Sequence, residues 1–196
     1  IELTQKMAFL LAQLSKSEIR SINITAEGEI SEYLDSLQTF ATVGVLAVSC
    51  GDEVNYVNAN FIAKEKGIDL TTSEFSNHSG YQNKVSINIT TPTGVKTISG
   101  TVFNEDVQRI VEINGFPLDI EPKGKMIIMR NHDVPGVIGE VGKILGNNNI
   151  NIADFRLSRG KDGALAVILI DEKACSDVLK KLDSLEAAIA VAYAEI

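Results

Sequence analysis

The chain of 196 residues contains little cysteine and no long apolar segment. Its two cysteines, Cys50 and Cys175, lie far apart in the sequence and have no metal-ligand spacing, so we expect two reduced thiols in a cytoplasmic protein. The longest apolar run, near residues 43–48, is much shorter than the ~20 residues that cross a bilayer. These absences argue against a disulfide-stabilised fold, a structural metal site and a membrane protein.

Basic residues are also in deficit, with 18 Lys and Arg against 26 Asp and Glu. Proteins that bind nucleic acid neutralise phosphates with clustered basic side chains, so an acidic chain without a basic stripe is not expected to bind it. The sequence lacks a strand–Gly-x-Gly-x-x-Gly–helix, and we predict no dinucleotide site on this chain. The two histidines, His78 and His132, have no carboxylate at helical spacing, and we predict no catalytic residue.

The first 120 residues contain segments with the hydrophobic periodicity of helices and segments with that of strands. Helical spacing of apolar side chains predicts helices over residues 3–14, 31–48 and 58–66. The predicted strands are residues 19–26, 68–74, 84–91, 95–103, 107–113 and 116–120, and apolar and polar residues alternate in the first and third of them. Asn114-Gly115 is a strong hairpin signal. We therefore predict an α/β domain with helices early and an antiparallel meander late.

A short polar connector, Glu121-Pro122-Lys123-Gly124, indicates a domain boundary, and we place the two domains at residues 1–123 and 124–196. The second domain has predicted strands at residues 125–131, 150–158, 164–170 and 188–196, and predicted helices at residues 137–145 and 174–182. The order β-α-β-β-α-β is that of the split βαβ, ferredoxin-like arrangement. The predicted fold class is therefore α/β (α+β), in two domains.

The segment NHDVPGVIG, residues 131–139, joins the first strand of the second domain to its first helix. We expect Asp133 to cap this helix, whose first-turn amides and positive end would hold a carboxylate. Asp133 would also contact a ligand ammonium, while Asn131 and Asn151 would donate and accept hydrogen bonds. His132 alternates with Asn131 and Asp133 and should point away. A capped helix after a tight turn needs an Asp and a Gly for folding alone, so the residue pattern also fits a site without a ligand.

Sequence patterns in both domains resemble those of known protein families. The pattern Asp133-x-Pro-Gly-Val-Ile-Gly, followed by NNINI at residues 148–152, is similar to the signature of ACT domains, which bind amino acids and regulate enzymes. In the first domain VNYVNA at residues 54–59, ISGTVF at 98–103 and RIVEING at 109–115 resemble long-form D-3-phosphoglycerate dehydrogenases. In that form an intervening substrate-binding domain precedes the ACT domain, so the resemblance covers nearly the whole chain.

This resemblance implies a function. Members of the family oxidise 3-phosphoglycerate with NAD in L-serine biosynthesis, and L-serine inhibits many of them. The chain starts with Ile1, not Met, so we expect a piece of a longer protein whose upstream domains bind NAD. Carried over by position, the L-serine contacts are the side chains of Asn131, Asp133 and Asn151 and the backbone amides of Val137 and Ile138. L-Serine would lie between the ACT domains of two copies, so we expect a homodimer at least.

The resemblance also implies an anion site for a phosphorylated ligand in the intervening domain. Arg109 matches one basic position of that site, whereas Glu121 stands where relatives have a second basic residue, and Lys123 is a nearby substitute. Two neighbouring cations are also common on a solvated surface. Two other functions remain open: the regulatory region of an iron–sulfur L-serine dehydratase, whose cysteine ligands would lie elsewhere, and a free-standing amino-acid-sensing module.

Overall fold

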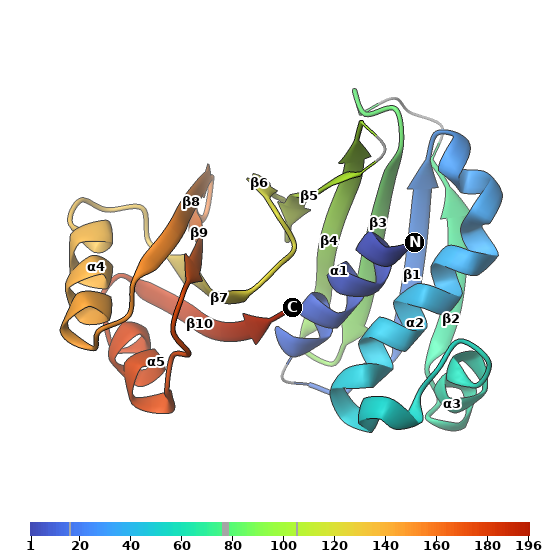
Figure 1. Ribbon diagram of the computed structural model, residues 1–196, viewed down its shortest axis with the longest axis horizontal. Helices are drawn as coiled ribbons and strands as arrows, with labels where there is room; N and C mark the ends of the chain where they lie inside the picture. The colour runs from blue at the N-terminus through green and yellow to red at the C-terminus, as the bar shows by residue number, and fades with distance from the viewer. Residues whose placement is uncertain (16, 76–78, 105) are drawn as a thin grey trace. The chain divides into compact units, whose positions relative to one another are not determined.

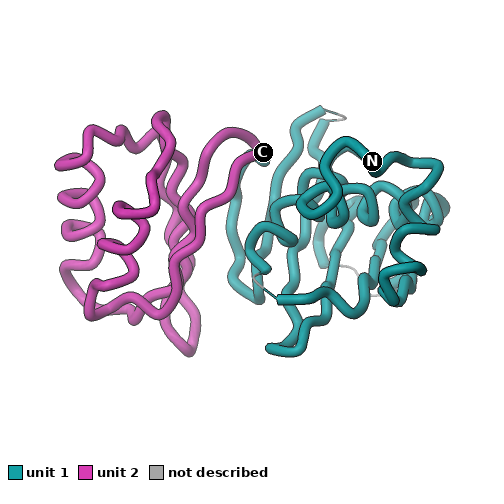
Figure 2. Tube along the Cα trace, turned by 90° about the horizontal axis from the view of Figure 1, so that it is seen from below, with its two compact units in different colours: residues 1–122 teal, residues 123–196 magenta. Residues whose placement is uncertain are grey.

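The computed structural model describes residues 1–15, 17–75, 79–104 and 106–196. His78 therefore lies outside the described residues. The chain divides into two compact units, unit 1 (Ile1–Pro122) and unit 2 (Lys123–Ile196), which Figure 2 colours separately. The division falls within the polar connector, one residue before the boundary that we placed from the sequence.

Unit 1 contains α1 (Glu2–Gln13), α2 (Leu34–Cys50) and α3 (Ala59–Glu65), with short 3-10 helices η1 (Glu29–Tyr33) and η2 (Gly51–Glu53) on either side of α2. Its strands are β1 (Ser21–Glu27), β2 (Asp69–Glu74), β3 (Lys84–Thr91), β4 (Gly94–Phe103), β5 (Val107–Ile113) and β6 (Phe116–Ile120). The predicted helix over residues 31–48 begins later than expected, because its first residues form the 3-10 turn η1.

The strands of unit 1 form one sheet in the order β2-β1-β3-β4-β5-β6. Only β1 and β2 pair in parallel, because the helices α2 and α3 connect them; the later strands follow one another through short turns and pair antiparallel. Figure 1 shows α1 and α2 on one face of this sheet, with α1 over β3 and β4 and α2 over β1 and β2. Alternate residues such as Ile22, Ile24 and Ile87 are fully buried under the helices.

The run Glu29–Glu53, which includes α2, is long and apolar enough to cross a membrane by length and composition alone. This differs from the sequence expectation because the apolar residues of α2 extend well beyond residues 43–48. In unit 1 the side chains of Leu37, Ala41 and Leu46 are buried where α2 packs on α1 and the sheet. Core helices of globular proteins can have the same length and apolar composition, and the buried side chains of α2 are those of a core helix.

Unit 2 has the predicted β-α-β-β-α-β order, with β7 (Lys125–Asn131), α4 (Val137–Asn147), β8 (Ile152–Gly160), β9 (Gly163–Ile170), α5 (Ser176–Asp183) and β10 (Ala188–Glu195). Its antiparallel sheet has the order β10-β7-β9-β8, so β8 and β10 are edge strands. The inner strand β9 is almost wholly buried. Figure 1 shows α4 and α5 on the same face, where Val141 and Leu182 pack over Ile127 and Ile168. The two-domain fold class predicted from the sequence is confirmed.

Candidate functional site

A pocket of about 340 Å³ lies in unit 2 between the sheet and the start of α4. Strand register explains which sheet residues meet there, because residues directly opposite each other on neighbouring strands share a face. Asn131, Ala164 and Arg159 are opposed across β7, β9 and β8, and Met129, Ala166 and Leu157 form the next such row. The pocket is lined from the sheet by Met129, Asn131, Phe155, Leu157, Arg159 and Ala166 and from the loop and α4 by Asp133, Val134, Pro135, Gly136, Val137, Ile138, Gly139 and Val141.

The loop before α4 ends at Gly136, whose φ of 97° is in the left-handed region that glycine adopts without strain. Gly136 is the N-cap residue, and no side chain of the described residues caps the helix. Our expectation that Asp133 caps α4 is therefore wrong. An N-cap side chain bonds to the amides two or three residues later, whereas Asp133 lies three residues before the N-cap. Val137 and Ile138, in the first turn of α4, line the pocket, and no side-chain cap among the described residues bonds to this end of the helix.

Asn131, at the end of β7, lines this pocket and has an unsatisfied acceptor on its side chain. The residue is only 3% exposed, and its Nδ2 donates a hydrogen bond to the carbonyl oxygen of His132 at 2.8 Å. Its Oδ1 is buried and has no hydrogen-bond partner among the residues that the structure describes. Leaving a buried acceptor unsatisfied costs about 1–3 kcal/mol. A ligand hydroxyl or ammonium in the pocket would supply the missing donor.

Asp133 and Arg159 are the charged residues that line the pocket, and they form an ion pair. Arg159 Nε donates a hydrogen bond to Asp133 Oδ2 at 2.7 Å. This hydrogen bond, together with the negative charge of Asp133, raises the pKa of the Arg159 guanidinium above its usual value. The Arg159 side chain is 71% exposed and that of Asp133 34% exposed. Sequence reasoning missed Arg159 because the predicted strand ended at residue 158, whereas β8 continues to Gly160.

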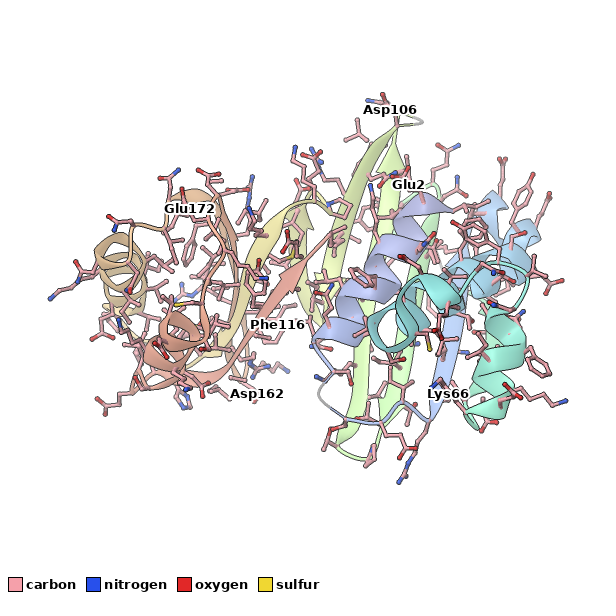
Figure 3. All side chains as sticks on the ribbon, turned by 60° about the horizontal axis from the view of Figure 1, so that its bottom comes forward. Glu2, Lys66, Asp106, Phe116, Asp162 and Glu172 are labelled. Carbon is pink, nitrogen blue, oxygen red and sulfur yellow. The ribbon has the colours of Figure 1, made fainter. Side chains whose placement is uncertain are left out.

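Asn151 does not line this pocket. It precedes β8, where its Nδ2 donates to Asp171 Oδ2 at 2.6 Å and its backbone amide donates to Glu172 Oε2 at 2.7 Å. Arg159 is eight residues further along an extended chain, and at about 3.3 Å per residue this separation is roughly 25 Å. Figure 3 shows Glu172, beside Asn151, and Asp162, in the turn after β8, at opposite ends of unit 2. Within one copy, four of the five predicted L-serine contacts therefore gather at one pocket and Asn151 lies at the far end.

The other candidate residues lie outside this pocket. His132 borders a neighbouring pocket of about 370 Å³ together with Glu140 and Glu186, in line with its expected direction. Arg109, on β5, pairs with Asp119 on β6, with its Nε 3.2 Å from Asp119 Oδ1. Arg109 belongs to unit 1, whereas Lys123 is the first residue of unit 2. An anion site formed by Arg109 and Lys123 stays a prediction.

The parallel strands of unit 1 belong to a βαβ connection of β1, α2 and β2, the kind of unit on which dinucleotides bind in other folds. A dinucleotide needs several glycines and a helix N-terminus against its pyrophosphate. The turn after β1 contains Gly28 alone, with φ of 87°, between Glu27 and Glu29. A Cβ on Gly28 would collide with the carbonyl oxygen of Gln82, so this glycine is required by close packing. The turn does not fit NAD, since its two carboxylates would repel a pyrophosphate.

Comparison with known proteins covers both units. A family model described as the D-3-phosphoglycerate dehydrogenase intervening domain matches residues 1–114, and one described as the ACT domain matches residues 125–187. A D-3-phosphoglycerate dehydrogenase of Bacillus subtilis is 36% identical over 86% of this chain and 32% of its own length. One of Mycobacterium leprae is 31% identical over 87% of this chain and 33% of its own length. A solved homoserine dehydrogenase from Thiobacillus denitrificans is 12% identical with a TM-score of 0.28, over 56% of this chain and 33% of that one.

Proposed function

The chain belongs to the family of D-3-phosphoglycerate dehydrogenase intervening domains and joins such a domain to an ACT domain, and from this premise we propose that it is a regulatory region whose unit 2 binds L-serine. The observation that carries the proposal is Asn131, a residue that lines the pocket and whose buried Oδ1 has no donor among the described residues. A pocket of about 340 Å³ is within the ~300–1,000 Å³ range of small-molecule sites.

Each polar group of L-serine has a counterpart at this pocket. The carboxylate suits the amides of Val137 and Ile138, because the start of a helix of 11 residues combines free N–H groups with a positive dipole end. The ammonium suits the carboxylate of Asp133. The hydroxyl suits Asn131 Oδ1, for which the described residues supply no donor. Ile138 is an exposed residue of the pocket lining.

The fifth contact, Asn151, would come from a second copy of the chain. β8 is an edge strand, and Leu157 on its pocket-lining face is 39% exposed. Edge strands have unpaired backbone groups that a second strand can satisfy. If two β8 strands paired antiparallel about a two-fold axis near Phe155, the start of β8 in one copy, next to Asn151, would lie toward the Arg159 end of β8 in the other copy. We therefore propose a homodimer through unit 2 that completes two equivalent sites.

The activity of the whole protein is part of the proposal. The chain spans about a third of the length of the curated relatives it matches. We propose that the parent protein oxidises 3-phosphoglycerate with NAD in the cytoplasm as a step of L-serine biosynthesis and that L-serine acts as its feedback effector. The turn after β1 does not fit NAD, so NAD would be bound by another part of the parent protein.

Calorimetry with L-serine, D-serine and glycine tests the binding. We expect L-serine to bind and to raise the melting temperature. Asp133→Ala should weaken binding by about 1–3 kcal/mol, the contribution of a hydrogen bond to a charged group. Asp162→Ala is the matched control, because Asp162 is exposed in the same unit and does not line the pocket. If millimolar L-serine produced neither heat nor a melting shift, the assignment would be wrong.

A further inference from the structure

The pocket of unit 2 already contains a cation of its own. The Nε of Arg159 is 2.7 Å from Asp133 Oδ2, the carboxylate assigned above to the ligand ammonium. Arg159 is held at this position by strand register, since it lies opposite Ala164, which lies opposite Asn131. The guanidinium therefore occupies the Asp133 oxygen with which a bound ammonium would pair.

We propose that Arg159 is a specificity-determining residue that competes with the ligand ammonium for Asp133. The proposal rests on the proposed amino-acid site and adds how that site distinguishes ligands. An ammonium must displace Arg159 before it can pair with Asp133. A ligand that has a carboxylate but no ammonium leaves the Asp133–Arg159 pair intact and gains nothing from Asp133.

The structure makes this exchange feasible. The Arg159 side chain is 71% exposed, so it can move into solvent without disturbing the core. Exposed ion pairs contribute little to stability because water and salt screen them. The competition should therefore weaken L-serine binding by a small factor rather than abolish it. Arg159 also lies on the edge strand β8, so its release would change the charge next to the proposed dimer contact.

The test compares two ligands that differ in one group, L-serine and L-glycerate, which has a hydroxyl in place of the ammonium. In Arg159→Gln, Asp133 loses its competitor, and we expect L-serine to bind about two- to five-fold more tightly. L-Glycerate should bind more weakly, because its carboxylate would meet an uncompensated Asp133. Arg159→Lys retains a cation and should keep both affinities within about two-fold of the wild type.

Lys143→Gln is the matched control. Lys143 is an exposed cation on α4 in the same unit, and it lines neither the pocket nor β8. Its substitution should leave both affinities unchanged. Weaker L-serine binding in Arg159→Gln would overturn the proposal, since Arg159 would then contact the ligand directly, and so would equal effects of Arg159→Gln and Lys143→Gln.

The outcomes separate this proposal from the proposed function. If the wild type binds L-serine and Arg159→Gln binds it equally well, the L-serine site stands and the competition is overturned. If only Arg159→Gln binds L-serine, the competition is supported and regulation of the wild type by L-serine is overturned. If neither protein binds L-serine, both proposals fail.

Discussion

Gly163, the first residue of β9, lies against the backbone of Asn131: a Cβ built on Gly163 would be 2.5 Å from the carbonyl oxygen of Asn131. The φ of Gly163 is 110°, a conformation that residues with a side chain rarely adopt. Both the positive φ and the contact with the Asn131 backbone therefore require glycine at position 163. The close approach therefore places Gly163, at the end of the turn after β8, against a residue that lines the pocket.

Gly163→Ala should destabilise unit 2 by about 1–3 kcal/mol, because the new Cβ is strained by φ and collides with a backbone oxygen. Urea unfolding, with hydrogen exchange of β7 and β9 amides, measures the loss. Gly142→Ala is the control, since no heavy atom among the described residues lies within 4 Å of its Cβ position in α4. It should be neutral or stabilise the protein by up to about 1 kcal/mol. Equal stabilities of the two variants would contradict the prediction.

Gly44 allows α1 and α2 to approach closely in unit 1. A Cβ on Gly44 would lie 2.9 Å from the Cβ of Ala8 and would collide with the carbonyl oxygen of Gln5. We expect Gly44→Ala to lower the free energy of unfolding by about 1–3 kcal/mol, as overpacking does in closely packed cores. Ser36→Ala, at an exposed position of the same helix, should stay within about 0.5 kcal/mol of the wild type. Thermal unfolding of both variants measures this difference, which should be absent if the helices can separate freely.

Burial and a hydrogen bond to Glu195 raise the pKa of Tyr193 to about 12. Its hydroxyl donates to Glu195 Oε2 at 3.1 Å. The unfolded chain would release this proton near pH 10, so between about pH 10 and 12 the folded state binds more protons and the free energy of unfolding falls as pH rises. Absorbance of the phenolate should show a phase near pH 12 that disappears in Tyr193→Phe. Tyr33→Phe, in unit 1, is the control and should retain that phase.

A complementation experiment tests the proposed dimer. Asp133→Ala and Asn151→Ala should each weaken L-serine binding in homodimers, since every site then lacks one contact. When the two variants are mixed and allowed to exchange subunits, half of the dimers are mixed, and one site in each has both native residues. About a quarter of all sites should then recover wild-type affinity. Recovery would be absent if Asn151 contacted ligand within its own chain or made no contact at all.

Most of the architecture followed from local patterns. The predicted bounds of β3, β5, β6 and β7 agree with the structure, because turn residues or the polar connector lie next to these strands in the sequence. Helix bounds were less accurate, as at α2, where the first turn is 3-10. Asn131, Asp133, Val137 and Ile138 could be placed at one site because they are close in sequence and flank the start of α4.

The sequence by itself determined the two-domain order, the βαββαβ arrangement and the helix start beside Asn131 and Asp133, since these depend on spacing along the chain. Only the tertiary structure decided which distant residues reach the pocket. The register of β7, β9 and β8 places Arg159 within hydrogen-bond distance of Asp133. Asn151, in contrast, lies at the other end of β8 and bonds to Asp171. The tertiary structure also assigned the cap of α4 to Gly136 and left Asn131 Oδ1 without a donor in the part of the chain that the structure describes. Register and burial depend on contacts between segments far apart in the chain, which local periodicity does not contain.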